Sequence, residues 1–118
     1  MDTQISRYDD TIDSRDVDER IGELEADEGR DEADNEELAA LIAFRDEAKP
    51  YCADWDYGET LIAGRYFKSY AMGLAEDIGA IDLKAPWPTN CIDWDEAADL
   101  LRQDYTSAEF GGYTFWFR

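Results

Sequence analysis

The chain has 118 residues, of which 30 are acidic and 11 basic, giving a formal net charge of −19. This charge excludes simple electrostatic attraction to DNA, RNA or anionic lipid, and the 14% of aromatic residues excludes a fully disordered chain. One small folded unit is expected, with a partner of opposite charge; the alternative is an acidic surface that serves only solubility or salt tolerance.

The acidic and aromatic residues lie in different parts of the chain. Residues 1–48 hold 18 acids and 5 bases, whereas residues 49–118 hold 12 acids and 6 bases. All four Trp, six of the seven Tyr and four of the five Phe follow Lys49. We therefore predict an α+β protein with an acidic helical section over residues 1–48 and an aromatic-rich α+β core over residues 49–118, joined at Pro50.

The acidic section predicts two helices. The first begins at Asp13 or Ser14, which can accept hydrogen bonds from the first turn, and it ends near Gly29. Its apolar positions form one narrow stripe of Val17, Ile21 and Leu24.

The second helix is expected to start at a cap, Asp34 or Asn35, and to end at Lys49, because a residue before proline is pushed out of the α region. Its apolar positions are Leu38, Leu41, Ile42 and Phe44. Two such helices favour a helical hairpin; one long helix bent at Gly29 is the alternative.

The rest of the chain predicts a helical core closed by a β-hairpin. Residues 54–58 read as a turn, and a third helix is expected from Glu59 or Tyr66 to Ile78. Residues 84–90 are expected to be a non-helical loop, and a fourth helix starts at the cap Asp93, with Glu96 completing a capping box.

The end of the chain predicts two strands, over residues 106–110 and 113–117, joined by a Gly111-Gly112 turn. Aromatic side chains alternate along the last strand, so both of its faces are expected to carry them. A lone hairpin is marginal in water, so this one must pack on the helices or pair with a strand from residues 1–12, where residues 4–6 are a candidate.

The residue inventory excludes most catalytic and metal sites. The chain contains no histidine, which removes the commonest general base and metal ligand. No phosphate loop is present, and Cys52 and Cys91 lack zinc-site spacing, so both are expected to be free thiols. The Asp54 loop fails the EF-hand pattern, because Gly and Glu are missing at positions 6 and 12. We expect no enzyme, no cofactor and no metal; a chance carboxylate pair is the enzymatic alternative.

Targeting features are also lacking. Residues 1–10 have no basic and apolar regions of a secretory signal, and no apolar run is long enough to span a bilayer. A cytoplasmic location without membrane contact is therefore expected.

The strongest functional feature is the density of acids between residues 13 and 37, where 13 acids face 3 bases. A continuous helix of that length would be roughly 37 Å long and would carry a net charge about every 3.7 Å, close to the phosphate spacing of about 3.4 Å along one DNA strand. Carboxylates also accept bidentate bonds from Arg, as phosphates do. The predicted partner-binding residues are Asp16, Asp18, Glu19, Glu23, Glu25, Asp27, Glu28, Asp31 and Glu32.

Residues 10–17, 66–79, Trp87-Pro88, 92–98 and 101–106 resemble a set of small acidic phage and prophage proteins. Residues 92–106 are also similar to the end of ArdA-type antirestriction proteins, which are acidic DNA mimics that occupy the DNA groove of type I restriction enzymes. Related phage inhibitors block CRISPR effector complexes. The resemblance implies a phage-encoded inhibitor that binds a basic nucleic-acid-binding protein or complex of the bacterial host and blocks its access to DNA.

A second hypothesis is an interaction adaptor. The narrow stripe of Val17, Ile21 and Leu24 would then dock on a partner helix or form a homodimer. Mutating the stripe would abolish its function, whereas mimicry predicts graded losses as several acids are neutralised together.

Overall fold

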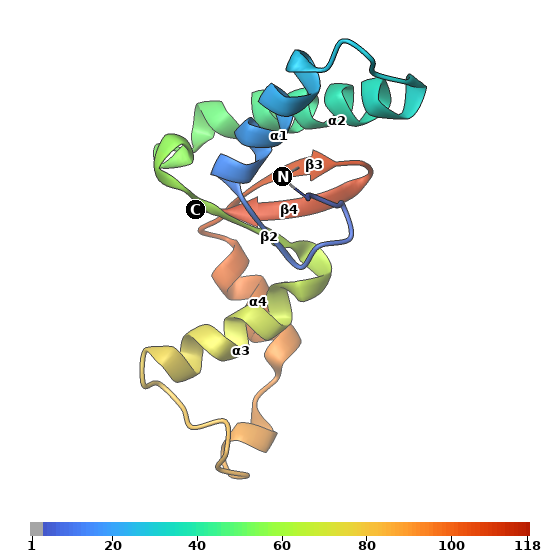
Figure 1. Ribbon diagram of the computed structural model, residues 1–118. Helices are drawn as coiled ribbons and strands as arrows, with labels where there is room; N and C mark the ends of the chain where they lie inside the picture. The colour runs from blue at the N-terminus through green and yellow to red at the C-terminus, as the bar shows by residue number, and fades with distance from the viewer. Residues whose placement is uncertain (1–3) are drawn as a thin grey trace.

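The computed structural model describes residues 4–118 (Figure 1). Its helices and strands are β1 (Thr11–Asp13), α1 (Ser14–Ala26), α2 (Glu32–Ala48), β2 (Thr60–Ala63), α3 (Phe67–Asp77), α4 (Trp94–Arg102), β3 (Thr106–Phe110) and β4 (Tyr113–Phe117). Short 3-10 turns cover Lys49–Tyr51, Trp55–Tyr57, Gly64–Tyr66 and Thr89–Cys91. The protein is α+β, as predicted: α1 and α2 lie on one side of an antiparallel sheet, with α3 and α4 on the other (Figure 1).

The sheet has the order β1-β2-β4-β3. Its best-predicted part is the β3–β4 hairpin, which has the expected bounds and pairs Phe110 with Tyr113 across the turn. Gly111 and Gly112 have φ angles of 59° and 86°, in the left-handed region that glycine enters at little cost. The two-glycine turn therefore suits the tight connection that the hairpin needs.

Two strand predictions need correction. The third helix does not begin at Glu59, because Thr60–Ala63 forms β2, which pairs with β1 on one edge and β4 on the other. The alternative start at Tyr66 is close, since Tyr66 is the N-cap of α3 and Ile78 its C-cap. Residues 4–6 form no strand; the partner from the N-terminal region is β1, with Thr11 opposite Ile62. Hydrogen bonds to distant strands fix this short segment as β-structure, and local sequence signals do not reveal such pairing.

The N-terminal helices form the predicted hairpin and not one long helix. Asp13 caps α1 by accepting from the Arg15 N–H at 2.9 Å. The cap of α2 is Asp31, not Asp34 or Asn35: Asp31 accepts from the Asp34 N–H at 2.8 Å, and the Asp34 side chain accepts from the Asp31 N–H at 3.4 Å. Asp34 thus occupies the third helical position of a capping box, which moves the helix start earlier.

Side chains from both sections of the chain form the larger core. Val17, Ile21 and Leu24 are 0%, 2% and 3% exposed and pack with α2 and with one face of the sheet. Residues 1–48 and residues 49–118 therefore share this core, through Phe44 on one side and Phe115 and Phe117 on the other. The apolar stripe on which the adaptor hypothesis depended is covered within the chain, so it offers no apolar docking surface.

A smaller core lies on the opposite face of the sheet. Ile62 on β2 and Trp116 on β4 point to this face. Their neighbours along the strands, Leu61, Phe115 and Phe117, point to the larger core. The last strand therefore carries aromatics on both faces, as predicted. α3 covers the smaller core with Phe67 and Ala71, and α4 covers it with Ala98.

The connection from α3 to α4 extends away from the sheet (Figure 1). Most of the expected loop over residues 84–90 is irregular, but its last two residues belong to the 3-10 turn Thr89–Cys91. Asp93 caps α4, as predicted, by accepting from the Glu96 N–H at 3.1 Å.

Candidate functional site

Arg20 clamps the helical hairpin from its half-buried side. Its guanidinium makes two bonds to Glu37 on α2, with Nε–Oε2 at 2.8 Å and Nη2–Oε1 at 3.0 Å. It also reaches Glu23 on its own helix at 3.4 Å. A bidentate arginine–carboxylate pair fixes geometry as well as charge, so α1 and α2 are held in one relative position.

Arg30 closes the tip of the hairpin. Its Nη1 donates to the carbonyl oxygen of Leu24 at 2.8 Å and to that of Asp27 at 3.3 Å, and its Nε donates to Asn35 at 2.9 Å. These carbonyls lie at the C-terminal end of α1, where unpaired oxygens and the helix dipole favour a cation. The positive charge of Arg30 is thus directed to the backbone of the hairpin.

The other bases of the acidic section are also engaged. Each contacts a group of this chain: Arg7 donates to the Gly111 carbonyl oxygen, Arg15 pairs with Asp13, and Arg45 pairs with Asp46. Exposed pairs of this kind contribute little to stability. The Arg15 and Arg45 pairs nevertheless place positive charge beside Asp13 and Asp46, which were not predicted to bind a partner.

The nine predicted acids divide into an exposed group and a structural group. Asp16, Glu19, Glu25, Glu28 and Glu32 are exposed.

The remaining four acids have roles within the fold. Asp18 accepts from the Trp55 indole Nε1 at 2.9 Å, and Glu23 pairs with Arg20. Asp27 accepts from the Gly29 N–H at 2.9 Å, and Asp31 caps α2. Asp27 and Asp31 are nevertheless exposed, so their outer surfaces add to the charge at the tip.

The break between α1 and α2 changes the expected charge spacing. The 13 residues of α1 extend over about 20 Å. Its five acids and two bases leave a net charge of −3, or about one per 6.5 Å. α1 alone therefore does not reach the charge spacing close to that of DNA phosphates that was expected for one continuous helix. The acids instead lie on two short paired helices and on the turn at their tip.

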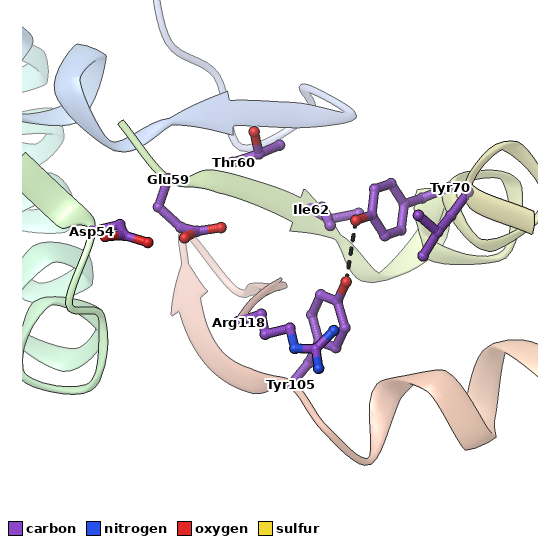
Figure 2. A pocket seen from close by; sticks show the side chains of 8 residues that line it. Asp54, Glu59, Thr60, Ile62, Tyr70, Tyr105 and Arg118 are labelled. Carbon is purple, nitrogen blue, oxygen red and sulfur yellow. Dashed lines mark hydrogen bonds between the residues drawn. The ribbon is translucent and has the colours of Figure 1, made fainter. Parts of the chain in front are cut away.

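A cavity of about 470 Å³ lies beside β2 on the face of the sheet that bears α3 (Figure 2). Its lining residues come from five separate parts of the chain: Asp54, Glu59, Thr60, Ile62, Tyr70, Leu74, Tyr105 and Arg118. The Tyr70 and Tyr105 hydroxyls are 3.1 Å apart. No pattern in the sequence indicates this site, because no spacing links residues that are up to 64 positions apart.

Burial sets the protonation of two groups in this cavity. It raises the pKa of Tyr105 to about 12, helped by the hydrogen bond to Tyr70. Burial also raises the pKa of Glu59, and the negative charge of Asp54 adds to this. At neutral pH the Tyr105 phenol is therefore uncharged, and the charged form of Glu59 is poorly stabilised by its surroundings.

No group of three or more Cys, Asp or Glu side chains within residues 4–118 is placed to hold a metal ion. Cys52 is buried and Cys91 is exposed, and both are free thiols, as predicted. Across the same residues no helix combines the length and apolar character needed to cross a bilayer.

Comparison with known proteins found no protein-family model, curated protein or solved structure that matches this chain.

Proposed function

We propose that this protein is a phage or prophage counter-defence inhibitor, not an enzyme, that acts in the cytoplasm of a bacterial host. It binds a nucleic-acid-binding defence complex, either a restriction enzyme or a CRISPR effector, through the acids of its helical hairpin. The bound hairpin occupies the path of DNA and blocks DNA access.

One observation carries the proposal: the bases between the two helices and at the tip of the hairpin bond within the hairpin, while acids remain outside; the exposed base Arg15 pairs with Asp13 at the start of α1. Arg20 and Arg30 bond to Glu37 and to backbone carbonyls, whereas Asp16, Glu19 and Glu28 are exposed. This arrangement concentrates negative potential over one end of the molecule. Such a surface would attract the rows of Arg and Lys with which proteins contact phosphates.

The first experiment is capture of partners from a bacterial lysate at low ionic strength, followed by competition with duplex DNA on each captured protein. We expect DNA to displace the inhibitor, and we expect the complex to weaken steeply as salt is raised. Captured proteins that do not bind nucleic acid, or complexes that DNA fails to displace, would contradict mimicry.

A matched pair of variants separates the hairpin surface from total charge. The test variant neutralises exposed hairpin acids: Asp16→Asn, Glu19→Gln, Glu28→Gln and Glu32→Gln. The control neutralises as many exposed acids elsewhere: Asp77→Asn, Glu96→Gln, Asp104→Asn and Glu109→Gln. Both variants carry the same net charge. The hairpin variant should lose capture in graded steps as changes are added, and the control should retain it; equal loss in both would show that only total charge matters.

A further inference from the structure

The cavity in Figure 2 joins acidic, phenolic and apolar surfaces. Glu59 and Asp54 lie at one end, and the paired hydroxyls of Tyr70 and Tyr105 lie at the other (Figure 2). Ile62 completes the wall on the sheet side. The cavity volume of about 470 Å³ is within the usual range of ligand pockets, roughly 300–1,000 Å³.

The electrostatics of the cavity favour a cation. Burial raises the pKa of Glu59, and the neighbouring Asp54 adds a second negative charge that raises it further. A positive group placed beside Glu59 would stabilise its charged form and offset that cost. Among the residues lining the cavity, Arg118 is the one base.

Arg118 already brings a guanidinium to this site. Its side chain lies on the Tyr105 side of the cavity (Figure 2), and its charge partly counters the burial that raises the pKa of Tyr105. Arg118 is exposed, and no ion pair within 4.0 Å joins it to Glu59 among residues 4–118. Its side chain can therefore move aside for a stronger cationic occupant.

The chemistry of the walls suits arginine better than lysine. A guanidinium donates two parallel bonds to a carboxylate and stacks on aromatic rings, whereas an ammonium acts as a point charge. The same fold uses this preference elsewhere: the Arg102 guanidinium lies 4.7 Å from the ring centre of Phe67 and 5.5 Å from that of Trp116. Carboxylate, phenol oxygen and apolar wall are all available in the cavity.

The cavity is also fixed to the base of the helical hairpin. The buried Ser14 hydroxyl, at the start of α1, donates to the Trp55 carbonyl oxygen at 2.7 Å and accepts from the Glu59 N–H at 2.7 Å. The Trp55 indole in turn donates to Asp18. One set of hydrogen bonds therefore positions both the acidic helix α1 and the Glu59 end of the cavity.

We propose that this cavity receives an arginine side chain of the partner protein, with Glu59 as its main carboxylate ligand and Tyr70 and Tyr105 lining its path. This assignment rests on the proposed function for the presence of a basic partner. The hairpin acids supply long-range attraction, and the cavity selects one arginine at a defined position.

The test uses the full-length ¹⁵N-labelled protein and blocked arginine, N-acetyl-arginine-N-methylamide, as the probe. Blocked citrulline is the matched control ligand, because it keeps the shape of arginine and lacks the charge. We expect saturable amide shifts around Glu59, Ile62, Tyr70 and Tyr105 with the arginine probe, and binding at least about tenfold weaker with the citrulline probe, which is the loss expected for a charge-assisted hydrogen bond.

Variants of the protein test the roles assigned to Glu59 and Arg118. Glu59→Gln preserves shape and should weaken the arginine probe at least about tenfold, whereas Glu109→Gln, an exposed acid outside the cavity, should leave binding unchanged. Arg118→Gln removes the resident guanidinium and should strengthen binding. The dispersion of the amide spectrum shows whether each variant is folded. Three results would overturn the proposal. The first is amide shifts that rise linearly with ligand concentration, without saturation, and that spread over the hairpin acids. The others are equal binding of the two ligands and unchanged arginine binding by the Glu59→Gln protein.

The two proposals fail separately. If the hairpin variant loses capture of a DNA-competed partner while Glu59→Gln retains full affinity for it, the arginine pocket is wrong and the inhibitor function stands. If the arginine probe saturates the cavity while DNA fails to displace captured partners, the pocket stands and mimicry is wrong.

Discussion

Replacing Phe44 by Ala tests whether the acidic hairpin and the rest of the chain form one cooperative unit. Phe44 is fully buried on α2, where its ring stacks on Phe110 at a centroid distance of 5.2 Å and contacts Phe115 at 5.6 Å. Truncating a buried Phe costs about 3–5 kcal/mol, of which each aromatic pair accounts for about 0.5–1.5 kcal/mol. A domain of this size has about 5–15 kcal/mol of total stability, so Phe44→Ala should remain folded only narrowly.

Urea denaturation measures the effect with two probes. Tryptophan fluorescence comes from residues 49–118, where all four Trp lie, although Trp55 also contacts α1 and so reports on the base of the hairpin. Far-ultraviolet circular dichroism reports on the whole of α1 and α2. With a denaturant slope of about 2 kcal/mol per M, a loss of about 4 kcal/mol lowers the midpoint by about 2 M. Both probes should move together.

Phe44→Leu keeps part of the ring volume and should give a smaller shift in the same direction. A Phe44→Ala loss under about 1 kcal/mol would refute the packing argument. A circular dichroism transition that precedes an unchanged fluorescence transition would refute the shared core, because the hairpin would then unfold alone.

Three further changes follow from individual contacts. Glu37→Gln breaks the half-buried clamp to Arg20 and should cost about 1–2 kcal/mol in urea denaturation, whereas the exposed Glu36→Gln control should cost little. Burial, and then the charge of Asp54, raises the pKa of Glu59, so the folded state holds this proton more tightly than the unfolded state and loses stability as pH rises through the folded pKa. Glu59→Gln should therefore unfold at a higher urea concentration than wild type at pH 7. Below the ordinary pKa of 4.5, where Glu59 is protonated in both states, the variant should show no such gain. Burial raises the pKa of Tyr105 to about 12, so Tyr105→Phe should remove the latest phase of an absorbance titration at high pH, and an unchanged late phase would contradict that assignment.

Local signals in the sequence predicted the helices and the C-terminal hairpin well. The start of α1 follows from the Asp13 cap and the stripe of buried apolar residues, and α4 follows from the Asp93 cap. The β3–β4 turn follows from Gly111-Gly112, which adopts positive φ angles. In each case, residues within one turn of the chain determine the local structure.

The central strand could not be predicted in the same way. Thr60–Ala63 is only four residues long, and its strand conformation depends on pairing with β1 and β4, which lie about 50 residues away on either side. The contacts of the basic residues in the hairpin could not be predicted from the sequence either. Nothing in the spacing of Arg20 and Arg30 shows that one binds Glu37 and the other binds the end of α1.

The cavity was missed for a related reason. Glu59, Tyr70, Tyr105 and Arg118 meet only because β2, α3 and the end of the sheet come together in the fold. The raised pKa of Glu59 reflects burial, which has no signature in the order of residues.

The hairpin geometry limits how closely the surface can imitate duplex DNA. α1 has a net charge of −3, and α2, with six acids and one base, has −5. The 17 residues of α2 extend over about 25 Å, so the pair carries about one charge per 3.2 Å, roughly half the density of a duplex at one per 1.7 Å. Under the proposed function, the hairpin then pairs with fewer cationic side chains of the partner than DNA does. The affinity of the partner for the inhibitor should therefore depend less steeply on salt than its affinity for DNA. Competition with DNA would require affinity from uncharged or geometrically specific contacts, which is the role that a pocket for a single arginine would fill.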